Sequence, residues 1–258
     1  WRPHTVIASG TKPNSPANRP AWGRHQVVET FRLRACNPLV FLGATLMGFS
    51  LWVAAHELLL FGEWIGLGGL NESAKQSAKV LDDQLQLVPL WLVLLTISAT
   101  PAIFEELCFR GFLFSAMEAT GRRRLASNGS ANSIGVPEDR STRRCIQIVA
   151  VTAIAFGAFH LVGSVVLIER LLPSTMMGLF IGWVAWRSHS IWPGILVHLI
   201  HNGLIMVVAR HKSFFEGLGL QANDDSAHFP ATWMAGAAIG VILGTAIVWL
   251  ATREKKAS

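Results

Sequence analysis

Two adjacent carboxylates and an arginine lie in the middle of a long apolar stretch of this sequence. Glu105, Glu106 and Arg110 fall within the apolar run from Leu87 to Met117. Ionisable side chains are costly at membrane depth, so such a cluster indicates a functional site. Glu106 and Arg110 are four residues apart and share one helix face, which predicts a structural ion pair. Glu105 lies about 100° further round the helix and is left as the working carboxylate.

Three more polar residues lie in later apolar segments: His160, then His198 and Asn202, which are also four residues apart. A carboxylate beside an imidazole can activate a water molecule as a general base. An imidazole and an amide on one helix face can donate hydrogen bonds to a developing oxyanion. These residue types therefore predict a peptide hydrolase. Glu105, His160 and His198 could instead bind zinc, which accepts carboxylate and imidazole ligands.

The composition indicates a membrane protein. The chain is 51% hydrophobic and 15% charged, whereas about a quarter of the residues of a soluble domain are charged. It has ten Trp and no Tyr, and Trp favours the membrane–water interface. The net charge of +6 comes from basic residues in loops and tails, as topology requires, so nucleic acid is not an expected partner. The three scattered cysteines have neither disulfide nor zinc-site spacing.

Six apolar segments predict an all-α polytopic fold with about six transmembrane helices. They cover residues 39–61, 87–117, 146–162, 171–186, 191–208 and 230–251. The second segment is too long for one straight crossing, and Pro101 is expected to kink or restart it. Gly178 and Gly182 have the G-x-x-x-G spacing that favours close helix packing.

The remaining residues predict the domain boundaries. A flexible basic tail (1–37) precedes a transmembrane domain (38–252), and a short basic tail (253–258) follows it. Residues 120–144 hold six arginines around a Ser/Asn/Gly-rich centre and are expected to be a disordered insert.

The distribution of basic residues predicts the topology. With one crossing for residues 87–117, both tails, the 120–144 loop and Arg187 share a side with sixteen Lys and Arg, against five on the other side. The positive-inside rule then places both termini in the cytoplasm of a cell-membrane protein. At 1.5 Å per residue, Glu105 and His160 both lie roughly 22 Å from the Arg-rich loop, and His198 lies about 17 Å from the same face. We therefore expect these residues and Asn202 to share one polar cavity.

The motifs resemble those of the CAAX prenyl protease and bacteriocin-processing (Abi) family of intramembrane proteases. The matching residues, within about 89–208, are Glu105-Glu106-x-x-x-Arg110, Phe156-x-x-x-His160 and His198-x-x-x-Asn202. The resemblance implies that Glu105 and His160 activate the attacking water, that His198 and Asn202 stabilise the oxyanion, and that Glu106 and Arg110 maintain the shape of the site. The family has been described both as metal-dependent and as glutamate-type. The Arg-rich insert is a departure from its pattern.

Several alternatives stay open on the sequence. The polar cluster could be purely structural, in a membrane scaffold or bacteriocin-immunity factor, or could serve ion transport. His201 could replace His198 in the cavity, and Phe156 is expected to pack rather than react. The substrate is a membrane-associated peptide or protein, and prenylated CAAX tails, leader peptides and membrane-anchored regulators all fit.

Overall fold

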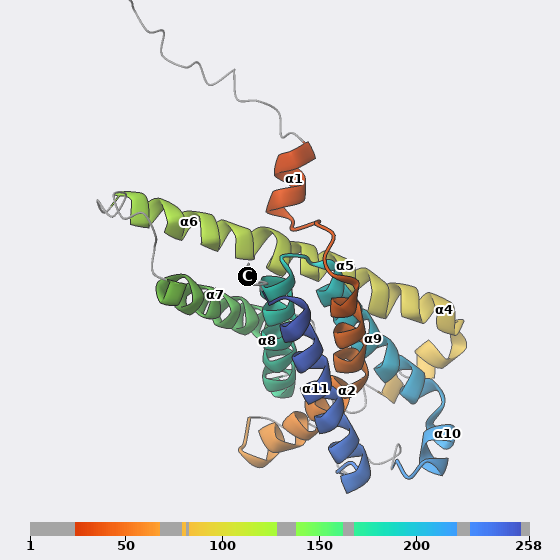
Figure 1. The fold of residues 1–258 in the computed structure, drawn as a ribbon. Helices are drawn as coiled ribbons and strands as arrows, with labels where there is room; N and C mark the ends of the chain where they lie inside the picture. Colours follow the sequence, from red (N-terminus) through yellow and green to blue (C-terminus); the bar gives the residue numbers. More distant parts are fainter. Residues whose placement is uncertain are drawn as a thin grey trace, which may run out of the picture.

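The protein is an all-helical bundle, as the sequence predicts (Figure 1). The computed structural model describes residues 24–67, 79–80, 83–127, 138–161, 168–220 and 228–253, and these ranges contain no strand. Within them, five helices are long and apolar enough to cross a membrane. They are α2 (Pro38–Trp64), the continuous helix Leu90–Gly121, the Ser141–Phe159 part of α7 (Glu138–Phe159), α9 (Trp192–Arg210) and α11 (Ala231–Ala251).

The sixth expected span is α8 (Leu171–Ser188), which is not among the five. This helix carries Pro173, Ser174 and Thr175 near its start and Arg187 in its last turn. It packs against α2, α7 and α9. A helix surrounded by protein needs fewer apolar residues than one that faces lipid, because its neighbours satisfy its polar groups. Five of the six expected spans are therefore among these helices, and α8 is a less apolar helix packed between its neighbours.

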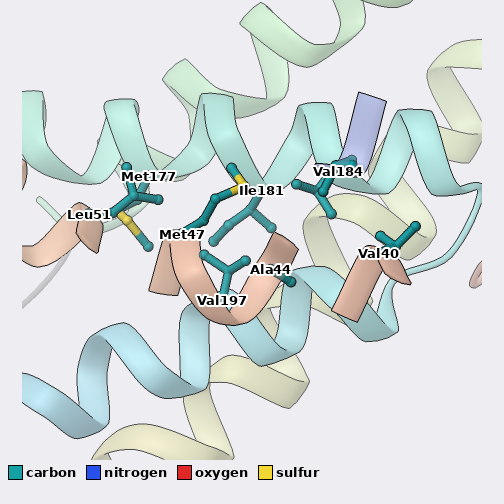
Figure 2. Close-up of a cluster of buried hydrophobic side chains, with 9 residues drawn as sticks. Val40, Ala44, Met47, Leu51, Met177, Ile181, Val184 and Val197 are labelled. Carbon is teal, nitrogen blue, oxygen red and sulfur yellow. The ribbon is translucent and has the colours of Figure 1, made fainter. Parts of the chain in front are cut away.

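The core lies where α2, α8 and α9 meet. Figure 2 shows its side chains, which interdigitate between these helices. They are Val40, Ala44, Met47 and Leu51 of α2, Met177, Ile181 and Val184 of α8, Val197 of α9 and Val248 of α11. The G-x-x-x-G prediction is confirmed on the other side of α8. A Cβ on Gly178 would lie 2.8 Å from Cα of Ala153, and one on Gly182 would lie 3.3 Å from a Val149 methyl group.

The helix that carries Glu105 runs unbroken past Pro101 and crosses the bundle (Figure 1). Its α-helical parts are α4 (Leu90–Val93), α5 (Thr100–Glu106) and α6 (Phe114–Ser127). Between them lie two π-helical turns, η2 (Leu94–Ala99) and η3 (Leu107–Leu113). The predicted restart at Pro101 is wrong, because the helix is continuous from Leu90 to Gly121, with the wider turn of η2 ending directly before Thr100-Pro101. Such turns within α-helices often occur at functional sites.

The N-terminal segment packs on the bundle from residue 24 onward. After α1 (Arg24–Thr30), the Arg32 side chain is buried, and its carbonyl oxygen accepts a hydrogen bond from the Ile191 N–H at 3.1 Å. Ser190 Oγ donates to the Arg34 carbonyl oxygen at 2.7 Å. The expectation of a flexible tail is therefore wrong for residues 24–37. Residues 1–23 lie outside the described ranges.

The Arg-rich insert is helical at both ends. Helix α6 continues to Ser127 and α7 begins at Glu138, so the expectation of disorder is wrong for these parts of 120–144. Residues 128–137 lie outside the described ranges. The Arg144 guanidinium donates to the carbonyl oxygens of Met117 and Glu118, both at 3.0 Å, which ties the start of α7 to α6.

The start of α2 and the ends of α8 and α11 lie together. Asn37 donates to the Ala251 carbonyl oxygen at 3.2 Å, and Arg187 donates to the Thr252 hydroxyl at 3.1 Å. The opposite connections include η5 (Ile168–Arg170) before α8 and α10 (Lys212–Gly217) after α9.

Candidate active site

Glu106 and Arg110 form the ion pair that their spacing predicts. Arg110 Nη1 lies 2.8 Å from Glu106 Oε1, and both side chains are completely buried. Arg110 Nη2 also donates to the Gly178 carbonyl oxygen of α8 at 3.0 Å. Its guanidinium carbon lies 4.5 Å from the centre of the Phe156 ring in α7. Glu106 and Arg110 therefore neutralise each other's charge, and Arg110 also joins the long helix to α7 and α8.

Glu106 has a second partner that the sequence analysis missed. His198 Nδ1 lies 3.2 Å from Glu106 Oε1, so the first and third motifs are in direct contact. A carboxylate paired with arginine is an acceptor, so the imidazole donates through Nδ1. The common depth predicted for the two helices indicates that His198 lies near the glutamates. It does not determine which of the two glutamates faces His198.

Glu105 is where the three motifs meet. Its Oε2 atom lies 3.9 Å from His160 Nε2 and 3.9 Å from His198 Nε2. Within the described ranges this oxygen is enclosed and has no hydrogen-bond partner. A separation of 3.9 Å is too long for a direct hydrogen bond, but catalytic contacts are often long before substrate binds. The structure thus brings the predicted carboxylate and both imidazoles together.

The spacing of Phe156 and His160 serves to orient the imidazole. His160 Nδ1 lies 2.8 Å from the Phe156 carbonyl oxygen one turn earlier. Donation through Nδ1 leaves Nε2 facing Glu105. The Phe156 ring is buried and lies 4.7 Å from the His160 ring and 5.7 Å from the His198 ring, centre to centre. Phe156 therefore supports both imidazoles and Arg110, in agreement with the packing role expected for it.

Asn202 lies at a small cavity beside these groups. The cavity has a volume of about 60 Å³ and is lined by Phe156 and His160 of α7, Pro173, Ser174 and Met177 of α8, and His198, His201 and Asn202 of α9. Both histidines of α9 therefore reach it. His198 is the one that contacts the glutamates, so His201 does not replace it.

The described side chains do not form a metal site. No group of three His, Cys, Asp or Glu side chains in the described part of the chain is placed to hold a metal ion. One nitrogen of His198 is already bonded to Glu106. Within the described ranges, Glu105, His160 and His198 therefore do not form the zinc-ligand group that the sequence allowed.

Comparison with known proteins agrees with the motifs. Residues 87–204 match the family model described as Type II CAAX prenyl endopeptidase Rce1-like, and this region contains all three motifs. Searches of curated proteins and of solved structures give no match.

Proposed function

We propose that this chain, whose residues 87–204 match the family model of Rce1-like type II CAAX prenyl endopeptidases, is an intramembrane endopeptidase in which Glu105 is the catalytic carboxylate. The substrate is a membrane-associated or lipidated peptide or protein. The observation that carries the proposal is the enclosed Glu105 oxygen, which faces the Nε2 atoms of His160 and His198 at 3.9 Å each.

Glu105 and His160 activate the attacking water. With Nδ1 donating to the Phe156 carbonyl oxygen, a neutral His160 presents the lone pair of Nε2 toward Glu105. A water bound between the two groups can donate a proton to either acceptor while its oxygen attacks the scissile carbonyl carbon. General-base assistance of this kind contributes about 10²–10⁴-fold to the rate.

His198 and Asn202 stabilise the oxyanion. For His198 to donate through Nε2 while Nδ1 donates to Glu106, the imidazole must carry both protons. Loss of one oxyanion donor costs about 10²–10³-fold in kcat.

Glu106 and Arg110 hold these groups in place without reacting. Glu106 accepts from both Arg110 and His198, and Arg110 continues the chain of hydrogen bonds to Gly178. Rigid support of this kind matters, because small displacements of reacting groups lower rates strongly.

The experiment is cleavage by purified protein in lipid nanodiscs. Three probes separate the substrate classes: a farnesylated peptide with a Cys-aliphatic-aliphatic-X end, the same peptide without the lipid, and a single-span membrane peptide. Cleavage of at least one probe is expected, with Glu105→Gln lowering the rate about 10²–10⁴-fold. If the wild type cleaves none of them and Glu105→Gln keeps its cellular role, the protein is a scaffold or immunity factor instead.

We also propose that both termini face the cytoplasm. The face shared by Asn37, Arg187 and Thr252 collects the helix ends that border the basic segments, which is the cytoplasmic pattern. Labelling of single cysteines at positions 34 and 253 in intact cells tests this, and neither should react with an impermeant reagent added outside. Reaction at either position would contradict the proposal.

A further inference from the structure

His201 lies on the same face of α9 as two motif residues but belongs to none of the motifs. It follows His198 by three residues and precedes Asn202, and all three line the cavity of about 60 Å³. Residues three and four apart in a helix are neighbours on its surface. Helical spacing therefore places His201 next to the proposed reaction centre.

The side chain of His201 is buried and incompletely bonded. Its exposed fraction is 7%, and within the described ranges Nδ1 is enclosed with no hydrogen-bond partner. The two other imidazoles of the site each place Nδ1 against an oxygen, Phe156 O for His160 and Glu106 Oε1 for His198. A buried polar atom without a partner destabilises the fold, and each such case in a native protein calls for an explanation. An apolar residue of similar size would fill this position at lower free energy.

The cavity indicates what His201 binds. A volume of about 60 Å³ is enough for a water molecule or a peptide group. Its walls combine apolar Pro173 and Met177 with the polar residues Ser174 and Asn202. A few polar groups in an apolar pocket are typical of sites that orient a ligand. The cavity adjoins the groups that would surround the scissile bond.

We propose that His201, together with Ser174, binds a backbone peptide group of the substrate next to the scissile bond. This inference rests on the proposed endopeptidase function and adds a substrate-binding pair to it. His201 would hold the substrate in both the ground state and the transition state. Its loss should therefore raise KM more than it lowers kcat.

The test uses the full chain in nanodiscs with the cleaved probe peptide. His201→Phe should raise KM roughly tenfold, the equivalent of one lost hydrogen bond, with kcat changed less than about threefold. Because the substitution removes a buried unpartnered nitrogen, the apparent Tm should stay the same or rise. His201→Asn, which restores a polar group, should recover part of the loss. Ser174→Ala should act in the same direction, whereas Ile205→Phe, on a half-exposed part of α9, should have no effect.

Binding to the inactive Glu105→Gln protein separates this inference from the proposed function. In that background, His201→Phe should weaken binding of the fluorescent probe peptide roughly tenfold. If the wild type cleaves and His201→Phe matches it in KM and binding, the inference is wrong and the protease reading stands. If His201→Phe lowers Tm or does not fold, His201 is structural and the inference is also wrong. If the wild type cleaves none of the probes but binds one of them through His201, the binding inference holds and the proposed protease function is wrong.

Discussion

Arg32 and Glu118 form an ion pair that joins the segment before the first span to the long motif-bearing helix. Arg32 Nη2 lies 2.9 Å from Glu118 Oε2, and their side chains are 7% and 22% exposed. Arg32 Nη1 donates to the Ala185 carbonyl oxygen of α8 at 3.0 Å, and its own carbonyl accepts from Ile191 at the start of α9. One residue outside the family-matched region 87–204 therefore connects the three helices that carry or support the first and third motifs.

Arg32→Ala should lower the free energy of unfolding by about 2–3 kcal/mol, because it leaves a largely buried carboxylate and a carbonyl without their partner. The measurement is denaturant-induced unfolding in detergent. Arg34→Ala is the matched control, since Arg34 pairs with Glu29 at 2.6 Å on an exposed surface and should contribute less than about 1 kcal/mol. Equal losses for the two variants would show that the Arg32 contacts do not stabilise the bundle.

Arg110→Ala and Glu105→Gln should separate the structural carboxylate from the working one. Removal of Arg110 leaves Glu106 buried without its counter-charge and should destabilise the protein by about 3–5 kcal/mol. Glu105→Gln removes no direct hydrogen bond of the described site and should unfold like the wild type. Thermal unfolding of both purified variants gives the comparison. A Glu105→Gln protein as unstable as Arg110→Ala would contradict this division of roles.

Glu105 and His160 should act as one unit. Each single variant, Glu105→Gln or His160→Ala, should lose about 10²–10⁴-fold in kcat/KM, because both groups contact the same water. The double variant should lose little more than either one, since residues that act together are non-additive. Cleavage of the probe peptide by all three variants under identical conditions is the measurement. Multiplicative losses would mean that the two groups contribute to separate steps.

Gly178→Ala should weaken the packing of α8 on α7. The added Cβ would lie 2.8 Å from the Cα of Ala153, which is backbone and cannot rotate away, so a loss of about 1–3 kcal/mol is expected. Gly236→Ala in α11 is the control, since nothing lies within 4 Å of its Cβ position and alanine favours a helix. Unfolding midpoints should therefore move in opposite directions. A tolerated Gly178→Ala would mean that α7 and α8 can separate freely.

Treatment with a chelator should leave cleavage unchanged, because in the proposed mechanism Glu105 and His160 activate the water directly. The assay compares activity before and after dialysis against EDTA, together with the metal content of the purified protein. Activity that is lost and then restored by zinc would reassign Glu105, His160 and His198 as ligands.

Much of the site follows from local sequence. Helical periodicity alone places Glu106 beside Arg110 and His198 on the same face as Asn202, since residues four apart are neighbours in any α-helix. Counting residues from the basic loops brings Glu105 and His160 to one depth, because a membrane fixes the height of each helix. The spacing of the small residues Gly178 and Gly182 likewise predicts a close contact between helices, but it does not identify the neighbouring helix.

Only the tertiary structure decided which faces of these helices meet. The contact of Glu106 with His198, the position of Phe156 under both imidazoles and the access of His201 to the cavity depend on how each helix is rotated about its axis. That rotation results from packing against several neighbours at once, which no single segment encodes. Arg32 is the clearest example of a residue whose position depends on the tertiary structure. It lies in a polar, proline-rich segment that has the composition of a flexible tail. It is buried because Glu118, Ala185 and Phe114, each distant in sequence, together satisfy its charge and cover its guanidinium.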